Sequence, residues 1–120
     1  KYDLTIAHPI GYELDTKFTN GARIEHDQQA ALEDADFVYV KNWSAFNDYG
    51  KILSTDASWM LTEKHFRHAK NAKVMHCLPV RRNLELSDEI LDGQRSLVQQ
   101  QAQNRIFAAQ AVISSILDGI

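Results

Sequence analysis

The stretch Met75-His76-Cys77-Leu78-Pro79-Val80-Arg81-Arg82-Asn83 decides how this chain is interpreted. It brings together a histidine, the single cysteine, a proline and two arginines. The mostly apolar run 72–75 before it predicts a short buried strand that ends at these reactive residue types. Ligands bind at the carboxyl ends of the strands in open α/β sheets. Arginine is also well suited to bind carboxylates or phosphates, so this stretch is a candidate site.

Size and composition indicate one small domain with a packed core. The chain has 120 residues, of which 44% are hydrophobic. A net charge of -3 gives no support for a nucleic-acid surface. No apolar run approaches the roughly 20 residues that cross a bilayer. One cysteine excludes an internal disulfide and fits a reducing compartment, which predicts a cytoplasmic protein. The chain begins at Lys1 without methionine, so we expect a piece of a longer protein.

Apolar runs and helix signals alternate along the chain. Strands are expected at 3–7, 22–26, 37–40, 72–75 and 97–98, with 37–40 as a central strand. Helices are expected at 15–20, 27–32, 62–69, 87–91 and 102–117, and Asp27 is predicted to cap the second of them. This alternation predicts an α/β fold, a Rossmann-like parallel sheet flanked by helices in one domain. No Gly-x-Gly-x-x-Gly occurs, so dinucleotide binding has little support.

Residues 41–58 form the longest irregular stretch, and they are both polar and aromatic. The stretch directly follows the expected strand 37–40 and begins with Lys41. A long loop in this place is more often functional than idle. Lysine is an unusual residue to follow a core-like strand, which makes Lys41 a second candidate site residue.

The segment His76-Cys77-Leu78-Pro79 resembles the His-Cys-Leu-Pro motif of the ornithine-type carbamoyltransferases. Extended by residues 80–83, it is similar to the branch that acts on N-acylated ornithine. Lys41-Asn42-Trp43, with residues 49–56 behind it, resembles the substrate loop of that branch. Ordinary ornithine enzymes carry Asp-x-Trp-x-Ser-Met-Gly there, and this chain does not.

Two further segments agree with this resemblance, which therefore covers nearly the whole chain in family order. They are the turn His8-Pro9-x-Gly11-Tyr12 and the element Gln103-Asn104-Arg105. The resemblance implies that residues 1–120 are most of the C-terminal, amino-substrate domain of a carbamoyltransferase. It also implies that the domain lacks its first strand-helix unit, and that the carbamoyl phosphate domain of the family precedes it in the full-length protein.

Two positions depart from the family pattern. The acetylornithine enzymes carry a lysine shortly after Arg-Arg-Asn, where this chain has Glu85. This difference favours N-succinylornithine over N-acetylornithine. Residues 99–103 are richer in glutamine than is typical of the family, which leaves the setting of Arg105 less well defined.

The resemblance implies that a neutral δ-amine attacks the carbonyl carbon of carbamoyl phosphate and that phosphate leaves. Such a reaction needs donors aimed at the developing oxyanion and groups that orient the amine. By resemblance, His76 and Cys77 are catalytic, with His76 donating to the oxyanion and Cys77 contacting the amine and the carbamoyl group. Leu78 would act through its backbone. No metal or organic cofactor is implied, and no zinc-type cluster is present in the sequence.

The resemblance assigns three cations to anionic ligands. Lys41 and Arg81 would bind the acylornithine carboxylate, and Arg105 would join Cys77 and Leu78 in binding carbamoyl phosphate near a helix start. The residues alone leave other interpretations open. Cys77 can be a buried hydrophobe and His76 a hydrogen-bonded core residue. Arg81 can form a surface ion pair, and Arg105 can be an ordinary helix-surface residue.

The favoured function is transfer of the carbamoyl group to N-succinylornithine in arginine biosynthesis. Such an enzyme would be a homotrimer in its full-length form, and this domain alone would be inactive. The alternatives are an ornithine or N-acetylornithine carbamoyltransferase domain, and a non-catalytic Rossmann-type module that binds anions.

Overall fold

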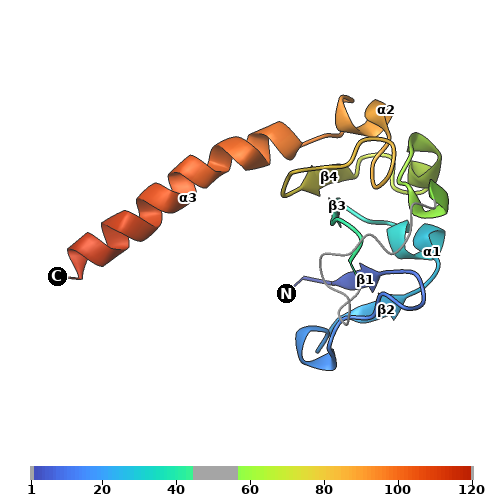
Figure 1. Cartoon of the computed structure of the whole chain (residues 1–120), viewed down its shortest axis with the longest axis horizontal. Helices are drawn as coiled ribbons and strands as arrows, with labels where there is room; N and C mark the ends of the chain where they lie inside the picture. The colour runs from blue at the N-terminus through green and yellow to red at the C-terminus, as the bar shows by residue number, and fades with distance from the viewer. Residues whose placement is uncertain (1, 45–56, 120) are drawn as a thin grey trace.

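Two pairs of parallel strands form the centre of the computed structural model, which describes residues 2–44 and 57–119 (Figure 1). The strands are β1 (Thr5–Ala7) with β2 (Arg23–Glu25), and β3 (Phe37–Val40) with β4 (Lys73–His76). The parallel direction confirms the predicted α/β class. Among the described residues β3 has β4 as its one strand partner, so the expected central position of 37–40 is not observed. Accordingly, Phe37 and Tyr39 are 65% and 50% exposed.

Short helices lie between the strands and after β4. They are α1 (Gln28–Leu32), α2 (Asp88–Leu91) and the 3-10 turns Thr16–Phe18, Ala57–Trp59 and Glu63–Phe66. Asp27 caps α1, because its carboxylate accepts from the backbone N–H groups of Gln29 and Ala30. The helices predicted at 15–20 and 62–69 are wrong as α-helices, since both segments form only a single 3-10 turn. Helices this short have few hydrogen bonds to offset the cost of nucleation.

The core lies between β4, α1 and α2. Val74, Leu86 and Ile90 are completely buried, and the partly buried Val38 and Val40 of β3 pack against them. Most of this cluster comes from the segment 61–90, which runs through β4 and into α2. The stretch that carries the candidate site therefore begins at the best-packed strand of the molecule.

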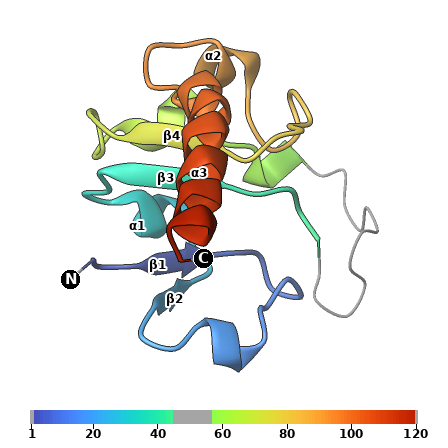
Figure 2. The same ribbon diagram turned by 90° about the vertical axis from the view of Figure 1, so that its left-hand side faces the viewer.

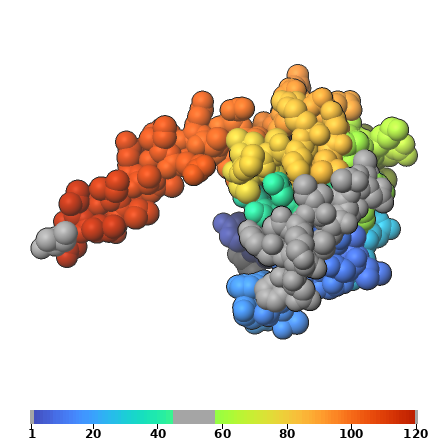
Figure 3. Space-filling view, viewed as in Figure 1, coloured from blue at the N-terminus to red at the C-terminus, as the bar shows by residue number. Residues whose placement is uncertain are grey.

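α3 (Val98–Asp118) projects away from the body, as Figures 1 and 3 show, and in Figure 2 it points toward the viewer in front of the strands. It starts four residues before the predicted position, and the short strand expected at 97–98 is wrong. Ser96 forms a single parallel bridge with Val74, and the helix begins two residues later. Val98 in the first turn is buried, whereas the large apolar side chains further along α3 are 57–67% exposed; they are Ile106, Phe107, Val112, Ile113, Ile116 and Leu117.

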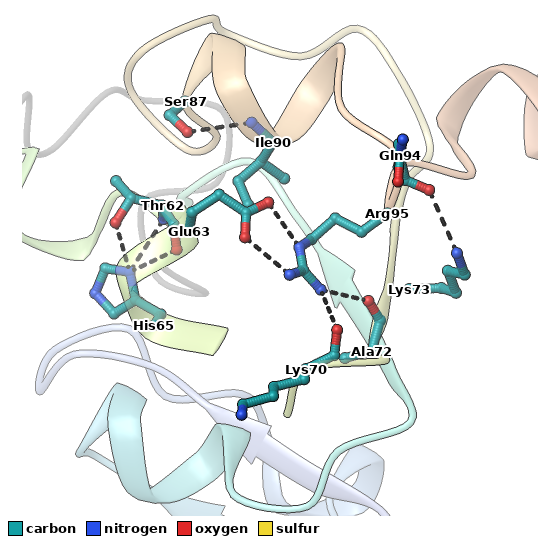
Figure 4. A network of polar contacts seen from close by, with 10 residues as sticks. All are labelled: Thr62, Glu63, His65, Lys70, Ala72, Lys73, Ser87, Ile90, Gln94 and Arg95. Atoms are coloured by element: carbon teal, nitrogen blue, oxygen red, sulfur yellow. Dashed lines mark hydrogen bonds and ion pairs between the residues drawn. The ribbon is translucent and has the colours of Figure 1, made fainter. Parts of the chain in front are cut away.

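Arg95 connects the segment after α2 to the loop before β4 (Figure 4). Its Nε and Nη2 donate to the two carboxylate oxygens of Glu63 at 2.7 and 2.8 Å. Its Nη1 donates to the carbonyl oxygens of Ala72 and Lys70 at 2.9 and 3.3 Å. The guanidinium also lies 4.2 Å from the centre of the Phe66 ring. This network fixes the amino end of β4 and so the direction in which the strand delivers His76.

Replacing Arg95 by alanine is expected to lower the free energy of unfolding by about 2 kcal/mol, because several charge-assisted hydrogen bonds are lost. The hydrogen bonds from Arg95 hold the pKa of Glu63 below its ordinary value of 4.5. This contribution to stability is present above that value and is lost as the pH falls through the lowered pKa. The difference in the free energy of unfolding between the wild-type and Arg95→Ala proteins should therefore shrink below about pH 4. Urea unfolding at pH 7 and pH 3 measures it, with the exposed Arg67→Ala as the control.

None of the helices in the described residues is both long and apolar enough to cross a membrane.

Candidate functional site

The carboxyl ends of β3 and β4 bring Lys41 next to Cys77. The strands are parallel and in register to their last pair, Val40 with His76. The residues that follow this pair are therefore neighbours, and Lys41 Nζ lies 3.6 Å from Cys77 Sγ. One position further, Asn42 Nδ2 donates to the carbonyl oxygen of Pro79 at 3.2 Å. Two segments that lie 36 residues apart in sequence thus come together as one candidate site at the carboxyl ends of the strands.

His76 is the buried centre of this site, with 1% of its surface exposed. Its Nδ1 accepts a hydrogen bond of 2.9 Å from the backbone N–H of Leu78. An Nδ1 that accepts must lack a proton, so in the neutral ring the proton is on Nε2. Burial lowers the pKa of His76; the Glu85 carboxylate opposes this shift and the Lys41 charge adds to it. The ring is therefore neutral near pH 7.

The Nε2 atom of His76 is buried and has no hydrogen-bond partner within the described residues. A buried N–H without an acceptor is costly, so such groups in native proteins usually have a reason to be there. Here the donor is held by a packed strand and by the bond to Leu78. No acceptor for it lies among the described residues, and the role expected for His76 toward a ligand stays a prediction.

The turn after Cys77 has an unusual backbone. Leu78 has a φ of +57°, and the Leu78–Pro79 peptide bond is cis. A bulky residue rarely adopts a positive φ, and this conformation is held only when its surroundings require it. It directs the Leu78 N–H to the His76 ring, and the backbone role expected for Leu78 toward carbamoyl phosphate stays a prediction. Leu78 and Val80 also line a hollow of about 410 Å³ with residues of α2 and of the first turn of α3.

The two arginines of the turn have different partners. Arg81 pairs through Nε and Nη2 with Glu85, whose side chain is completely buried. The Arg81 backbone N–H also donates to Glu85 Oε2 at 3.0 Å. Arg82 instead contacts two exposed carboxylates, Asp88 at 2.6 Å and Asp92 at 2.8 Å. Arg81 thus forms an ion pair with a buried partner rather than on the surface, and its role toward a substrate stays a prediction.

Arg105 is the predicted site residue that the structure does not bring to the others. It is exposed on α3, seven positions after Val98, and no hydrogen bond of the described residues connects it to the site. The expectation that it lies near the start of a helix is therefore wrong. The attraction of a helix dipole for anions is confined to the first turn, so it gives Arg105 no support as a phosphate ligand.

Sequence reasoning missed two residues that contact the site. In the sequence, Glu85 stands out only because the acetylornithine enzymes carry a lysine there. Its burial against Arg81 has no signal in the sequence. Gln101 lies within the glutamine-rich run, and its Oε1 accepts from the His76 backbone N–H at 3.0 Å. The rest of the expected substrate loop, residues 49–56, lies outside the described residues. Within the described part of the chain no cluster of three or more His, Cys, Asp or Glu side chains could hold a metal ion.

The sequence model described as "Aspartate/ornithine carbamoyltransferase, Asp/Orn binding domain" matches residues 1–116. The chain belongs to this carbamoyltransferase family. This assignment confirms the resemblance found in the motifs around His76, Lys41 and Arg105.

Several relatives within the carbamoyltransferase family are similar to this chain over almost all of its length. The N-succinylornithine carbamoyltransferases of Bacteroides fragilis and Bacteroides thetaiotaomicron are 45% and 42% identical to it. Each match covers 99% of this chain and 38% of the relative. The ornithine carbamoyltransferase of Methanococcus aeolicus is 34% identical over 95% of this chain and 43% of the relative. The chain therefore spans less than half the length of these relatives.

A solved structure of N-acetyl-L-ornithine transcarbamylase has the same carbamoyltransferase fold. It superposes with a TM-score of 0.83 at 26% identity, over 94% of this chain and 40% of the other. A variant of that enzyme, complexed with carbamyl phosphate and N-succinyl-L-norvaline, gives a TM-score of 0.78 at 25% identity. The short parallel strand pairs and helices described above are thus those of a Rossmann-like fragment of a carbamoyltransferase.

Proposed function

We propose that this chain is the amino-substrate domain of an N-succinylornithine carbamoyltransferase of arginine biosynthesis. The observation that carries the proposal is the convergence of Lys41, His76 and Cys77 at the ends of two parallel strands. A buried, neutral His76 with an unused Nε2–H is a suitable donor to an oxygen that becomes negative. The names of the two Bacteroides relatives support the choice of N-succinylornithine.

In the proposed reaction the uncharged δ-amine attacks the carbonyl carbon of carbamoyl phosphate. A new C–N bond forms and negative charge moves to the carbonyl oxygen. The carbonyl then re-forms as the bond to the phosphate oxygen breaks, and the attacking nitrogen loses one proton to the leaving phosphate. His76 donates to the charged oxygen through Nε2. Cys77, with Lys41 beside it, lies where the amine and the carbamoyl group meet. Arg81 binds the substrate carboxylate, and Arg105 binds carbamoyl phosphate once the rest of the full-length protein meets α3.

The acyl group is assigned from Glu85 and from the relatives together. Glu85 occupies the position where the acetylornithine branch resembled by the motifs carries a lysine. Glu85 is a buried carboxylate that is paired with Arg81, so an acylated substrate would meet a different charge here than in an enzyme that carries a lysine at this position. The solved transcarbamylase variants bound to carbamyl phosphate and N-succinyl-L-norvaline support a family site that holds this pair of ligands.

The whole enzyme is proposed to be a cytoplasmic homotrimer that needs no cofactor. This chain spans 38% of the length of its Bacteroides relatives, so most of the enzyme lies outside it. Contacts made only in the transition state would then be divided between this domain and the remainder. We therefore expect residues 1–120 alone to be inactive.

The test is carbamoyl transfer by the full-length protein that contains this segment. With carbamoyl phosphate, kcat/KM is expected to be at least about 100-fold higher for N-succinylornithine than for ornithine, since a site built for a polar group strongly rejects a substrate that lacks it. N-acetylornithine should fall between the two. Faster turnover of free ornithine would contradict the proposed acyl group. No turnover of any ornithine derivative would contradict the enzyme and favour a module that only binds anions.

A further inference from the structure

Gln101 connects α3 to the ends of both strands that form the site. It is the fourth residue of α3 and is half-buried, whereas Gln100 and Gln103 beside it are exposed. Its Oε1 accepts from the His76 backbone N–H at 3.0 Å, and its Nε2 donates to the Tyr39 hydroxyl at 3.3 Å. One amide side chain thus contacts β4 and β3 at once.

This contact completes the support of His76. The ring is fixed by the hydrogen bond from the Leu78 N–H to Nδ1, and the backbone is fixed by Gln101. Because His76 is the last residue of β4, a small rotation of its backbone would turn the imidazole away from its present direction. The contact from Gln101 opposes this rotation at the position where the strand ends.

The same contact fixes the helix that carries Arg105. α3 has no side-chain hydrogen bond at its N-cap, and most of its surface beyond the first turns is exposed. Among the described residues, Gln101 makes the side-chain hydrogen bonds from this helix to β3 and β4. Arg105 lies four positions later, so both side chains are on the same face of the helix. The direction of α3 relative to His76 therefore depends on Gln101.

We propose that Gln101 is a positioning residue that aligns His76 and Arg105 with each other at the carbamoyl-transfer site. The inference rests on the function proposed above and adds a residue to it. An amide suits this place for a further reason. It accepts from the His76 N–H without bringing a charge close to the imidazole, and a neutral imidazole keeps Nδ1 free to accept from Leu78.

In the full-length enzyme, Gln101→Leu is expected to lower kcat/KM for carbamoyl phosphate by about 10- to 100-fold, because small misplacements of catalytic groups have effects of this order. KM for the acylornithine should stay within about twofold, since Lys41 and Arg81 do not contact Gln101. Gln100→Ala, in an exposed position of the same helix, is the matched control and should leave both constants unchanged. Equal losses in the control and in Gln101→Leu would overturn the proposal.

Gln101→Glu separates positioning from simple stabilisation of the fold. A carboxylate still accepts from the His76 N–H, so activity should return to near the wild-type level at high pH. Its charge favours the protonated imidazole, so the acid limb of the pH-rate profile should move up by roughly one unit. An unchanged acid limb would overturn the inference.

The same variant also distinguishes the failure of this inference from the failure of the proposed function. If the wild-type protein turns over no ornithine derivative, the function has failed. The His76 imidazole is then titrated by NMR in the full-length wild-type and Gln101→Glu proteins. A pKa raised by the carboxylate supports the contact, and an unchanged pKa overturns it.

Discussion

In the full-length protein, replacing Arg81 by alanine is expected to lower the free energy of unfolding of this domain by roughly 3–5 kcal/mol. Replacing the adjacent Arg82 by alanine should change it far less. Both arginines are ion-paired, but their partners differ in burial. The Glu85 side chain is completely buried, whereas Asp88 and Asp92 are 53% and 63% exposed. Without Arg81, a carboxylate is left inside the protein with no compensating charge. Without Arg82, the two exposed carboxylates return to water.

Native-state hydrogen exchange of the β4 and α2 amides measures this difference within the domain, whatever the rest of the protein does. The double variant Arg81→Met with Glu85→Leu should recover most of the lost stability, since it removes both charges and leaves apolar volume in their place. Similar exchange rates in Arg81→Ala and Arg82→Ala would contradict the assigned burial of Glu85.

This ion pair also changes how an activity measurement on Arg81 must be interpreted. Glu85 accepts from Nε and Nη2 of the guanidinium, which leaves Nη1 outside this pair. Nη1 can still donate to a substrate carboxylate, so the structural and the proposed ligand roles are compatible. An inactive Arg81→Ala enzyme would not separate them. Activity that stays lost in the double variant, whose stability is restored, would support the contact with the substrate.

The site could be predicted largely because it lies at strand ends. The β-branched and aromatic run 37–40 and the mostly apolar run 72–75 are recognisable as strands. Their pairing and its register come from the structure, and this register is what makes Lys41 and Cys77 neighbours. Asp27 acts as the predicted helix cap for an equally local reason, since its carboxylate satisfies free N–H groups of the next few residues. Local signals of this kind survive folding because they do not depend on distant contacts.

The start of α3 could not be predicted, because the usual signals are absent there. Leu97 precedes the helix without a side-chain cap, and the glutamine-rich residues 99–103 show no apolar periodicity. The helix begins where it does because the Leu97 N–H bonds to the Val74 carbonyl and because Gln101 contacts β3 and β4. These contacts cross the fold and leave no local pattern. The error in the helix start is also what placed Arg105 wrongly beside a helix N-terminus.

The burial of Glu85 is unpredictable for a related reason. Charged residues are almost always exposed unless they are paired. The pairing depends on the turn 77–83, in which Leu78 and Asn83 both have positive φ angles; asparagine often adopts such an angle, but leucine rarely does. That turn folds the chain back so that Arg81 can reach Glu85 four positions later. The departure at Glu85 was visible in the sequence, but its structural meaning was not.

Replacing His76 by phenylalanine in the full-length protein is expected to lower kcat for carbamoyl transfer by roughly 100- to 1,000-fold, the usual effect of removing one oxyanion donor. Phenylalanine keeps the ring volume in a buried position but removes Nε2–H. KM for the acylornithine should change little, because the lost contact belongs to the transition state. Steady-state kinetics measure both constants, and the exposed His68→Phe is the control.

The alternative role of His76, a hydrogen-bonded core residue, predicts a different result. Phenylalanine leaves the Leu78 N–H without its acceptor, so either role predicts some loss of stability. A core residue would lose activity only as far as the protein unfolds, and the folded fraction, followed by circular dichroism, would account for all of it. A well-folded variant with unchanged kcat would contradict the oxyanion role. A well-folded variant with a large loss of kcat would support the oxyanion role. It would mean that the acceptor of the His76 Nε2–H is the oxygen that becomes negative in the transition state.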